Sequence, residues 1–256
     1  LVICSYGLFE SICSTLVNKI MQIFEGIKSF GALYHDNEPQ PLPSRPWIVD
    51  FSILQKPFVG MEPGNISEFE PAPDWSRWRL GDTSSNSKNN LNWVILKDTI
   101  RRLYICDRII LVRVSWQDLF DAGYVDGIKV VIDGKTYKCR LMSGGSDFHL
   151  DNDGLSGGHP ADNEWDRFVS GREKIKGLPS LTSIDKTGVL SDEVLQSPHN
   201  QFWNWVGAVS WTSTPYVNRD TARCCRGYQA GQFFYLNTYD HRHEDIGWRP
   251  ILEELL

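Results

Sequence analysis

The sequence has no cluster of lysine and arginine residues that could form a basic surface. It contains 26 Lys and Arg against 32 Asp and Glu, and its formal net charge at pH 7 is −6. A protein that binds nucleic acid needs a basic stripe to neutralise the phosphates. The charge distribution therefore argues against a dedicated DNA- or RNA-binding protein.

Cysteines are few and poorly placed for structural cross-links. The six cysteines form no C-x-x-C pair, and Cys224 and Cys225 are adjacent. Neighbouring cysteines do not normally bridge each other, and structural zinc sites normally use closely spaced thiolate pairs. We interpret the cysteines as mostly buried free thiols in a protein made in a reducing compartment.

Long apolar runs are also missing, since none reaches the length of a membrane-spanning helix. The first residues, LVICSYGLF, contain no basic segment and no A-x-A-like cleavage site. We therefore expect no signal peptide in this stretch.

The motifs of the common catalytic sites do not occur: there is no G-x-S-x-G, H-E-x-x-H, P-loop or dinucleotide-binding fingerprint. His241 and His243, with Asp240 and Asp245 nearby, could begin a metal site, but no third convergent ligand is evident. A polar surface that faces a ligand is the preferred interpretation. We expect no catalytic residues and no metal.

A glycine-rich loop carries carboxylates that would suit calcium, namely Asp147, Asp151, Asp153 and Asp162. A solvated acidic loop is the preferred interpretation, and calcium stays an alternative. We therefore expect no cofactor.

Residues 1–35 show a helical period over 9–30. A heptad assignment puts Cys13, Ile20 and Ile27 at one core position and Phe9, Leu16, Ile23 and Phe30 at the other. Isoleucine at both positions favours three or more helices. The pattern predicts an amphipathic helix that joins an oligomer, most simply a trimer. Packing on its own domain and contact with a membrane surface are the alternatives.

Residues 36–99 differ in amino-acid composition from the rest of the chain. Prolines such as Pro41 and Pro57 interrupt any regular helix, and residues 83–92 form a polar tract. Aromatic residues are spread through the segment, which predicts an extended arm or linker pinned to a neighbouring surface. A compact ligand-binding domain is predicted over residues 100–256.

Within that domain three local signals are clear. Ser115 and Asp118 form a capping box for a helix that Gly123 ends. The dipeptide at 133–134, Asp-Gly, lies between two β-rich runs and predicts a hairpin. A helix is predicted over 160–169, with proline at its start and a glycine beyond its end.

The C-terminal stretch has two aromatic anchors, one around Trp203, Trp205 and Trp211 and the other at 246–249. The segment between the anchors has little periodicity and an unusual mixture of side chains. Anchors around such a segment suggest a rigid scaffold that presents a recognition surface. Trp203, Trp205 and Trp248 are predicted to be core.

Four pieces of sequence, in this order, resemble the formylglycine-generating-enzyme branch of the C-type lectin-like fold. Residues 114–118 (VSWQD) are similar to its V-S-W-x-D helix start, 160–166 (PADNEWD) to its L-P-T-E-A-E-W-E helix, and 200–205 (NQFWNW) to its G-N-V-W-E-W motif. Residues 226–228 and 246–249 are similar to its R-G-G-S and I-G-F-R ending. The resemblance implies an α+β C-type lectin-like domain, preceded here by the N-terminal helix and the arm.

The family's oxidases bind copper through a pair of cysteines that follows the R-G-G-S-like motif. Residues 226–249 contain no cysteine, and Cys224 and Cys225 match neither the place nor the spacing. The chain therefore departs from the family at its catalytic residues. The departure predicts that the protein is not an enzyme.

The ending also resembles the variable proteins of diversity-generating retroelements of bacteria and their phages. In those proteins adenine-directed mutagenesis rewrites a C-terminal stretch, and residues 233–240 consist wholly of residues that such mutagenesis can produce from asparagine codons. Aromatic and small polar side chains are the mixture that binding surfaces use. The predicted ligand-binding residues are Cys225, Gln229, Phe233, Phe234, Tyr235, Asn237, Tyr239, Asp240, His243 and Asp245.

The resemblance implies a ligand-binding protein that recognises a protein or glycan receptor on a cell surface, with an oligomer adding avidity. A phage virion or a bacterial cell surface is the expected location. The alternatives are a glycan-binding lectin, or a modifying enzyme of the formylglycine-generating type that has lost its copper cysteines.

Overall fold

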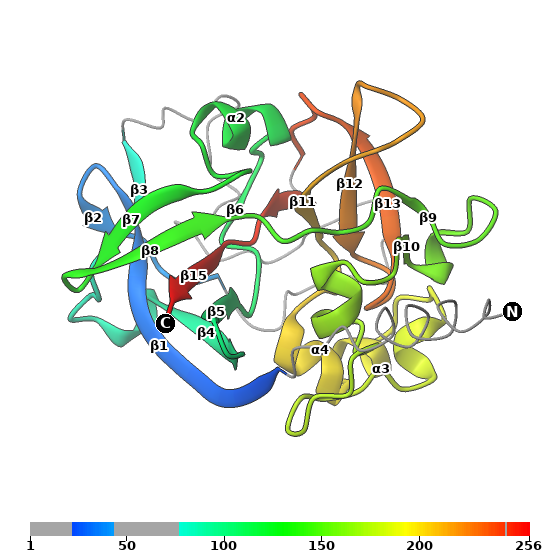
Figure 1. Ribbon diagram of the computed structural model, residues 1–256, viewed down its shortest axis with the longest axis horizontal. Helices are drawn as coiled ribbons and strands as arrows, with labels where there is room; N and C mark the ends of the chain where they lie inside the picture. Colours follow the sequence, from blue (N-terminus) through cyan, green and yellow to red (C-terminus); the bar gives the residue numbers. More distant parts are fainter. Residues whose placement is uncertain (1–21, 44–76, 244) are drawn as a thin grey trace, which may run out of the picture.

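A computed structural model describes residues 22–43, 77–243 and 245–256. Within them, one antiparallel sheet of eight strands curls into an open half-barrel, and a second sheet of five strands lies beside it (Figure 1). In spatial order the strands of the large sheet are β2 (Glu38–Pro39), β1 (Ile23–His35), β4 (Asn90–Lys97), β5 (Arg101–Cys106), β15 (Ile251–Leu255), β8 (Lys135–Arg140) and β7 (Ile128–Ile132), with β3 (Trp78–Gly81) also paired to β1.

The smaller sheet carries the C-terminal segment. Its strands, in spatial order, are β13 (Phe234–Thr238), β12 (Ala222–Gly227), β11 (Val209–Pro215), β14 (Ile246–Trp248) and β6 (Leu111–Val112). A two-stranded pair, β9 (Asp147–Phe148) and β10 (Gly158–His159), completes the described strands. The described helices and helical turns are η3 (Ser87–Asn89), α2 (Trp116–Asp121), η4 (Gly154–Ser156), η5 (Trp165–Val169), η6 (Ile184–Lys186), α3 (Asp192–Leu195) and α4 (Pro198–Trp203).

The central strands of the large sheet are buried on both faces, because consecutive residues point to opposite faces and are apolar here. On β4, Trp93 packs into one core cluster and Val94 into the other, and on β15 Leu252 and Ile251 divide in the same way. The first cluster fills the curl of the sheet and continues under the smaller sheet. The second cluster joins the large sheet to α3 and α4.

The α+β C-type lectin-like fold that we expected is contradicted by this architecture. The described chain is mostly antiparallel β-sheet, and none of its α-helices exceeds six residues. The fold is dominated by pairing between strands that are far apart in the sequence. Such pairing leaves no periodic pattern in the sequence that would link one strand to its partner. Even the C-terminal strand β15 lies inside the large sheet, between β5 and β8 (Figure 1).

The expected helix over 9–30 is wrong for its described part, because Ile23 to Phe30 belong to strand β1. Ile23 and Ile27, two of the proposed heptad core residues, are 53% and 51% exposed. Gly26 has a φ of 116° at a bulge opposite β4. A glycine inside the heptad pattern disfavours a helix. The other heptad residues lie outside the described residues, and the trimer stays a prediction.

The prediction that residues 36–99 form an extended arm or linker is wrong for the part that forms β4. Strand β4 pairs along its length with both β1 and β5, so it is a central strand of the domain. The polar tract before it packs locally, since Asn90 accepts a hydrogen bond from the backbone of Ser84. A domain boundary near residue 100 therefore does not exist in the sheet.

Two local predictions are confirmed. The Ser115 hydroxyl accepts from the Asp118 amide, and the Asp118 carboxylate accepts from the Ser115 amide, which completes the capping box of α2. The hairpin of β7 and β8 turns at Asp133 and Gly134, whose φ values are 51° and 75°. Both residues have the left-handed backbone that a two-residue hairpin turn requires.

The helix expected over 160–169 is shorter than predicted. Only the π-helical turn η5 (Trp165–Val169) forms, with Ser170 N–H donating to the Trp165 carbonyl. The side-chain oxygen of Asn163 accepts from the Asp166 amide, which starts the turn late. A short polar side chain has here replaced a helical backbone bond.

Candidate functional site

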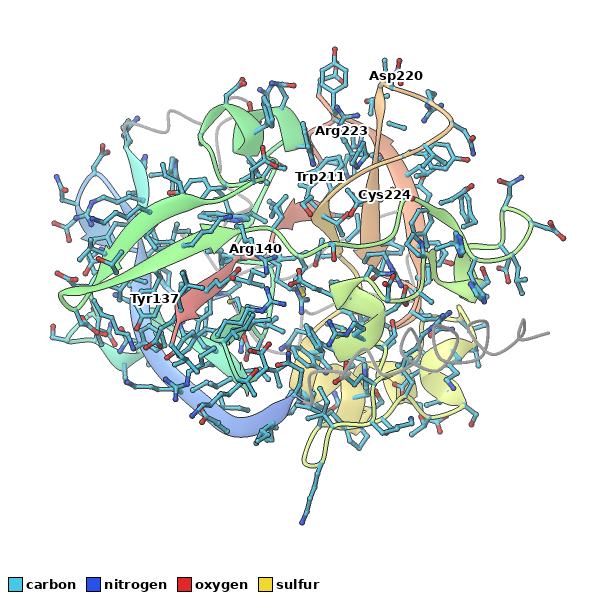
Figure 2. The ribbon with its side chains drawn as sticks, viewed as in Figure 1. Tyr137, Arg140, Trp211, Asp220, Arg223 and Cys224 are labelled. Atoms are coloured by element: carbon cyan, nitrogen blue, oxygen red, sulfur yellow. The ribbon has the colours of Figure 1, made fainter. Side chains whose placement is uncertain are left out.

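The candidate site lies on one face of the smaller sheet, where β12 and β13 pair. Arg223 is opposite Asn237, and Cys225 is opposite Tyr235, in antiparallel register. Opposite residues of such a pair point to the same face. Side chains of alternate residues therefore share this face. Arg223 and the next residue of β12, Cys224, are labelled in Figure 2.

A cavity of about 350 Å³ opens on this face. Two segments close it around β13: the loop that joins β12 to β13, and the segment that leads from β13 to β14. The cavity is of the size that encloses a small ligand or a large side chain. The residues that line it are Val209, Tyr228, Gln229, Phe233, Tyr235, Asn237, His241, His243 and Asp245.

One wall of the cavity is aromatic. The rings of Phe233 and Tyr235 are stacked, with centroids 5.9 Å apart and planes 19° from parallel. Tyr235 is 47% exposed, so a ligand can reach its ring. Tyr228 completes the wall, with a φ of 89°. The wall thus offers flat apolar surface and two phenol groups, those of Tyr228 and Tyr235.

The C-terminal part of the lining forms a second, polar wall. The rings of His241 and His243 stack with centroids 5.9 Å apart. His243 Nδ1 lies 2.7 Å from Asp245 Oδ1, a distance at which the ring N–H donates to the carboxylate. The backbone holds this wall: the Arg113 amide donates to the His243 carbonyl, and the Val209 amide donates to the Asp245 carbonyl.

A buried ion pair fixes the loop behind the aromatic wall. Arg226 and Asp166 are fully buried, and Arg226 Nη2 lies 2.6 Å from Asp166 Oδ1. Arg226 also donates to the carbonyls of Gln232 and Phe233, and to that of Gly144, so all five of its N–H groups are used. Burial alone would raise the pKa of Asp166, but the charge and hydrogen bonds of Arg226 lower it below its ordinary value.

The predicted aromatic anchors are confirmed as core. Trp203, Trp205 and Trp248 are completely buried. Arg249, also buried, donates to the carbonyls of Trp203 and Asn204 at 2.6 and 2.9 Å. The anchors thereby hold the two ends of the C-terminal segment to one frame.

Six predicted ligand residues meet at the cavity: Gln229, Phe233, Tyr235, Asn237, His243 and Asp245. The other four do not. Cys225 and Phe234 are fully buried, so they were wrongly expected to touch a ligand. Phe234 points to the far side of the sheet because it precedes Tyr235 by one residue in β13.

Tyr239 and Asp240 lie beside the cavity, outside its lining. The guanidinium of Arg223 sits 4.2 Å from the Trp116 ring centroid and 5.6 Å from that of Tyr239. Tyr239 is half-buried in this stack, while Asp240 is exposed. Tyr239 therefore supports the surface next to the site.

Three lining residues were not among the ten predicted ligand-binding residues: Val209, Tyr228 and His241. We expected His241 to share a polar surface with His243, and the rings of both residues stack beside each other in the cavity lining. Val209 and Tyr228 gave no signal in the sequence, since only the pairing of β11 with β12 brings them under β13.

The geometry of the described residues does not support the metal sites that were considered as alternatives. Among the described residues no three His, Cys, Asp or Glu side chains converge in a way that could hold an ion. In the acidic loop, Asp147 and Asp153 accept hydrogen bonds from the backbone of neighbouring residues. Burial raises the pKa of Cys224 to about 12 and the pKa of Cys225 well above its ordinary value. Both thiols therefore stay protonated at neutral pH.

No protein-family model, curated protein or solved structure matches this chain. In the part of the chain that the structure describes, no helix is both long enough and apolar enough to cross a membrane.

The frame beneath the site contains a histidine that makes stability depend on pH. Trp205 Nε1 donates to His199 Nδ1 at 2.8 Å, and His199 Nε2 lies 2.8 Å from the Val169 carbonyl. Burial lowers the pKa of His199 from 6.5 to about 4. The unfolded chain therefore takes up a proton that the folded chain excludes as the pH falls below 6.5, and the folded state loses stability.

We expect His199→Gln to reduce this dependence. Wild-type protein should be the more stable at pH 7.5, and its advantage should shrink by about 2 kcal/mol between pH 6.5 and 5, at about 1.4 kcal/mol per pH unit. Urea unfolding at a series of pH values measures both proteins, with His149→Gln as an exposed control. A constant difference between wild type and His199→Gln would contradict the prediction.

Proposed function

We propose that this protein is a non-catalytic, ligand-binding protein that recognises a receptor through the cavity on the smaller sheet. The main support is the convergence of six residues, predicted from the sequence as ligand contacts, around one cavity. Their side chains are mostly partly exposed, while the frame that holds them is buried. A rigid frame with adaptable aromatic and polar side chains is suited to recognition.

Catalysis is the less favoured function. The His243–Asp245 pair could orient an imidazole as a general base, but a base of this kind needs a nucleophile within hydrogen-bond reach. Among the described residues, no hydroxyl or thiol forms a hydrogen bond with the ring of His241 or His243. Cys224 and Cys225 are buried and protonated.

The expected receptor is a protein or glycan on a cell surface, and a phage virion or bacterial surface is the proposed location. We expect Tyr235→Ala to weaken receptor binding at least tenfold, because truncation of a central aromatic removes contact area that water refills. The melting temperature should change by no more than about 2 °C, since Tyr235 is half-exposed.

Arrays of cell-surface proteins and of glycans, probed with the full chain, would test this expectation. Phe120→Ala is the matched control, because Phe120 is 45% exposed and does not line the cavity. Equal binding by wild type and Tyr235→Ala would contradict the function. A glycan hit that depends on Tyr235 would favour the lectin alternative.

We also propose that a retroelement diversifies this surface. Cavity positions 233, 235, 237, 243 and 245 hold Phe, Tyr, Asn, His and Asp, which adenine-directed mutation can produce from asparagine codons. Gene copies from one population should differ at these positions and agree at Trp203, Arg226 and Trp248. A near-identical template repeat beside a reverse-transcriptase gene should accompany them. Uniform copies without such a repeat would contradict this proposal.

A further inference from the structure

The cavity has a distinctive electrostatic composition. Asp245 is the one formally charged side chain among its nine lining residues, apart from the titratable histidines, and no lysine or arginine lines it. Phosphate, sulfate and carboxylate ligands would find no cation to pair with. We propose that the cavity binds a cationic side chain of a protein partner, with arginine preferred; this inference rests on the proposed function.

The carboxylate of Asp245 acts inside the cavity. Burial raises the pKa of Tyr228, and the negative charge of Asp245 raises it further, as does Tyr235. The phenol is therefore near enough to sense the carboxylate. A cation that enters the cavity would experience the same field with the opposite sign, and would be stabilised by it.

The position of Asp245 is fixed before a ligand arrives. Its carbonyl accepts from the Val209 amide at 2.7 Å, and its Oδ1 pairs with His243 Nδ1. The side chain remains 28% exposed, and its Oδ2 accepts no hydrogen bond from the described residues. One carboxylate oxygen is thus held by the protein and the second is left for a donor on the ligand.

The aromatic wall adds a second source of cation affinity. Phe233, Tyr235 and Tyr228 present ring surface to the same cavity, and the face of an aromatic ring attracts a cation. The amide nitrogen of Asn237 lies 3.8 Å from Cys225 Sγ, which leaves its side-chain oxygen as an acceptor. Gln229 supplies another amide oxygen.

Arginine fits this arrangement better than lysine. Its planar guanidinium can stack on an aromatic ring while its edge donates several hydrogen bonds to carboxylate and amide oxygens. Lysine presents a strongly hydrated point charge, which gains less from a flat wall. A neutral sugar could stack on Tyr235, but it would gain little from the charge of Asp245.

The test compares two probes of nearly the same shape. N-acetyl-arginine methylamide carries the charge, and N-acetyl-citrulline methylamide is its neutral isostere. Amide chemical shifts of the full, isotope-labelled chain would be followed during titration with each probe, and with methyl β-galactoside. We expect the arginine probe to bind about tenfold more tightly than citrulline, with shifts centred on Tyr228, Tyr235 and Asp245.

Variants locate the effect. Asp245→Asn should abolish the preference for arginine over citrulline, and Asp240→Asn, an exposed aspartate outside the cavity, should preserve it. Equal affinities of the two probes, or tighter binding of the galactoside, would overturn the cationic assignment while leaving a functional cavity. If the arginine preference is unchanged in Asp245→Asn, the assignment also fails. If no probe shifts the cavity and Tyr235→Ala leaves receptor binding intact, the proposed function fails as well.

Discussion

Trp248→Ala should lower the free energy of unfolding by about 3–5 kcal/mol, the range for removing a fully buried aromatic ring. Trp248 is completely buried in β14, and its ring lies 4.5 Å from that of Tyr124. Its carbonyl also accepts from the Ile110 amide, which joins β14 to the segment before β6. The substitution leaves this backbone hydrogen bond in place, so the loss comes from the packing of the ring in the small sheet.

Urea unfolding at 25 °C would measure the change, and the melting temperature should fall by about 10 °C. Phe120→Ala is the control: its ring stacks on that of Trp116 but is 45% exposed, so its loss should cost far less. A Trp248→Ala protein as stable as the control would show that β14 is not part of the frame.

Asp166→Asn should lower the free energy of unfolding by a similar amount, although asparagine has nearly the same shape as aspartate. It would leave the guanidinium of Arg226 buried without a counter-ion, and breaking such a pair costs about 3–5 kcal/mol. Because Arg226 also holds the carbonyls of Gln232 and Phe233, we expect the aromatic wall to shift. Ligand binding should weaken together with stability.

Calorimetry and receptor-binding measurements on the same protein would test both expectations. Asp36→Asn is the matched control, because Asp36 pairs with Arg77 at an exposed position and tolerates a left-handed backbone as asparagine. Its melting temperature should equal that of wild type. Full stability in Asp166→Asn would mean that the ion pair contributes nothing to the frame.

These two residues indicate how the fold would stay stable under the proposed variation of the cavity surface. The frame lies in the buried tryptophans and in arginines whose donors end on backbone carbonyls. Such contacts hold the main chain whatever side chains the loops carry. Changes at Tyr235 or Asn237 therefore alter the cavity at little cost to folding.

Local features of the fold could be predicted from the sequence because neighbouring residues determine them. The capping box at Ser115 and the turn at Asp133 and Gly134 depend on side chains and backbone within four residues. The burial of the tryptophan anchors followed from their size and apolarity. Six cavity residues could be predicted because the C-terminal segment is short and chemically unusual.

The overall architecture could not be predicted in the same way. The apolar spacing of Ile23, Ile27 and Phe30 fitted a helix, yet β4 offers these residues a strand partner about 70 positions away. Strand β15 takes its place between β5 and β8 through partners that are still further apart in the chain. Pairing over such distances leaves no local pattern, so tertiary contacts overrode the helical period.

The sequence by itself determined the local turns and caps, the buried anchors and the chemical character of the C-terminal segment, because each depends on side-chain type or on close neighbours. Only the tertiary structure decided which residues line the cavity. Alternation along β13 buries Phe234 and exposes Tyr235, and pairing of β12 with β11 places Val209 and Tyr228 in the cavity. The direction of a strand's side chains is set by its partners, which the sequence of the strand alone does not name.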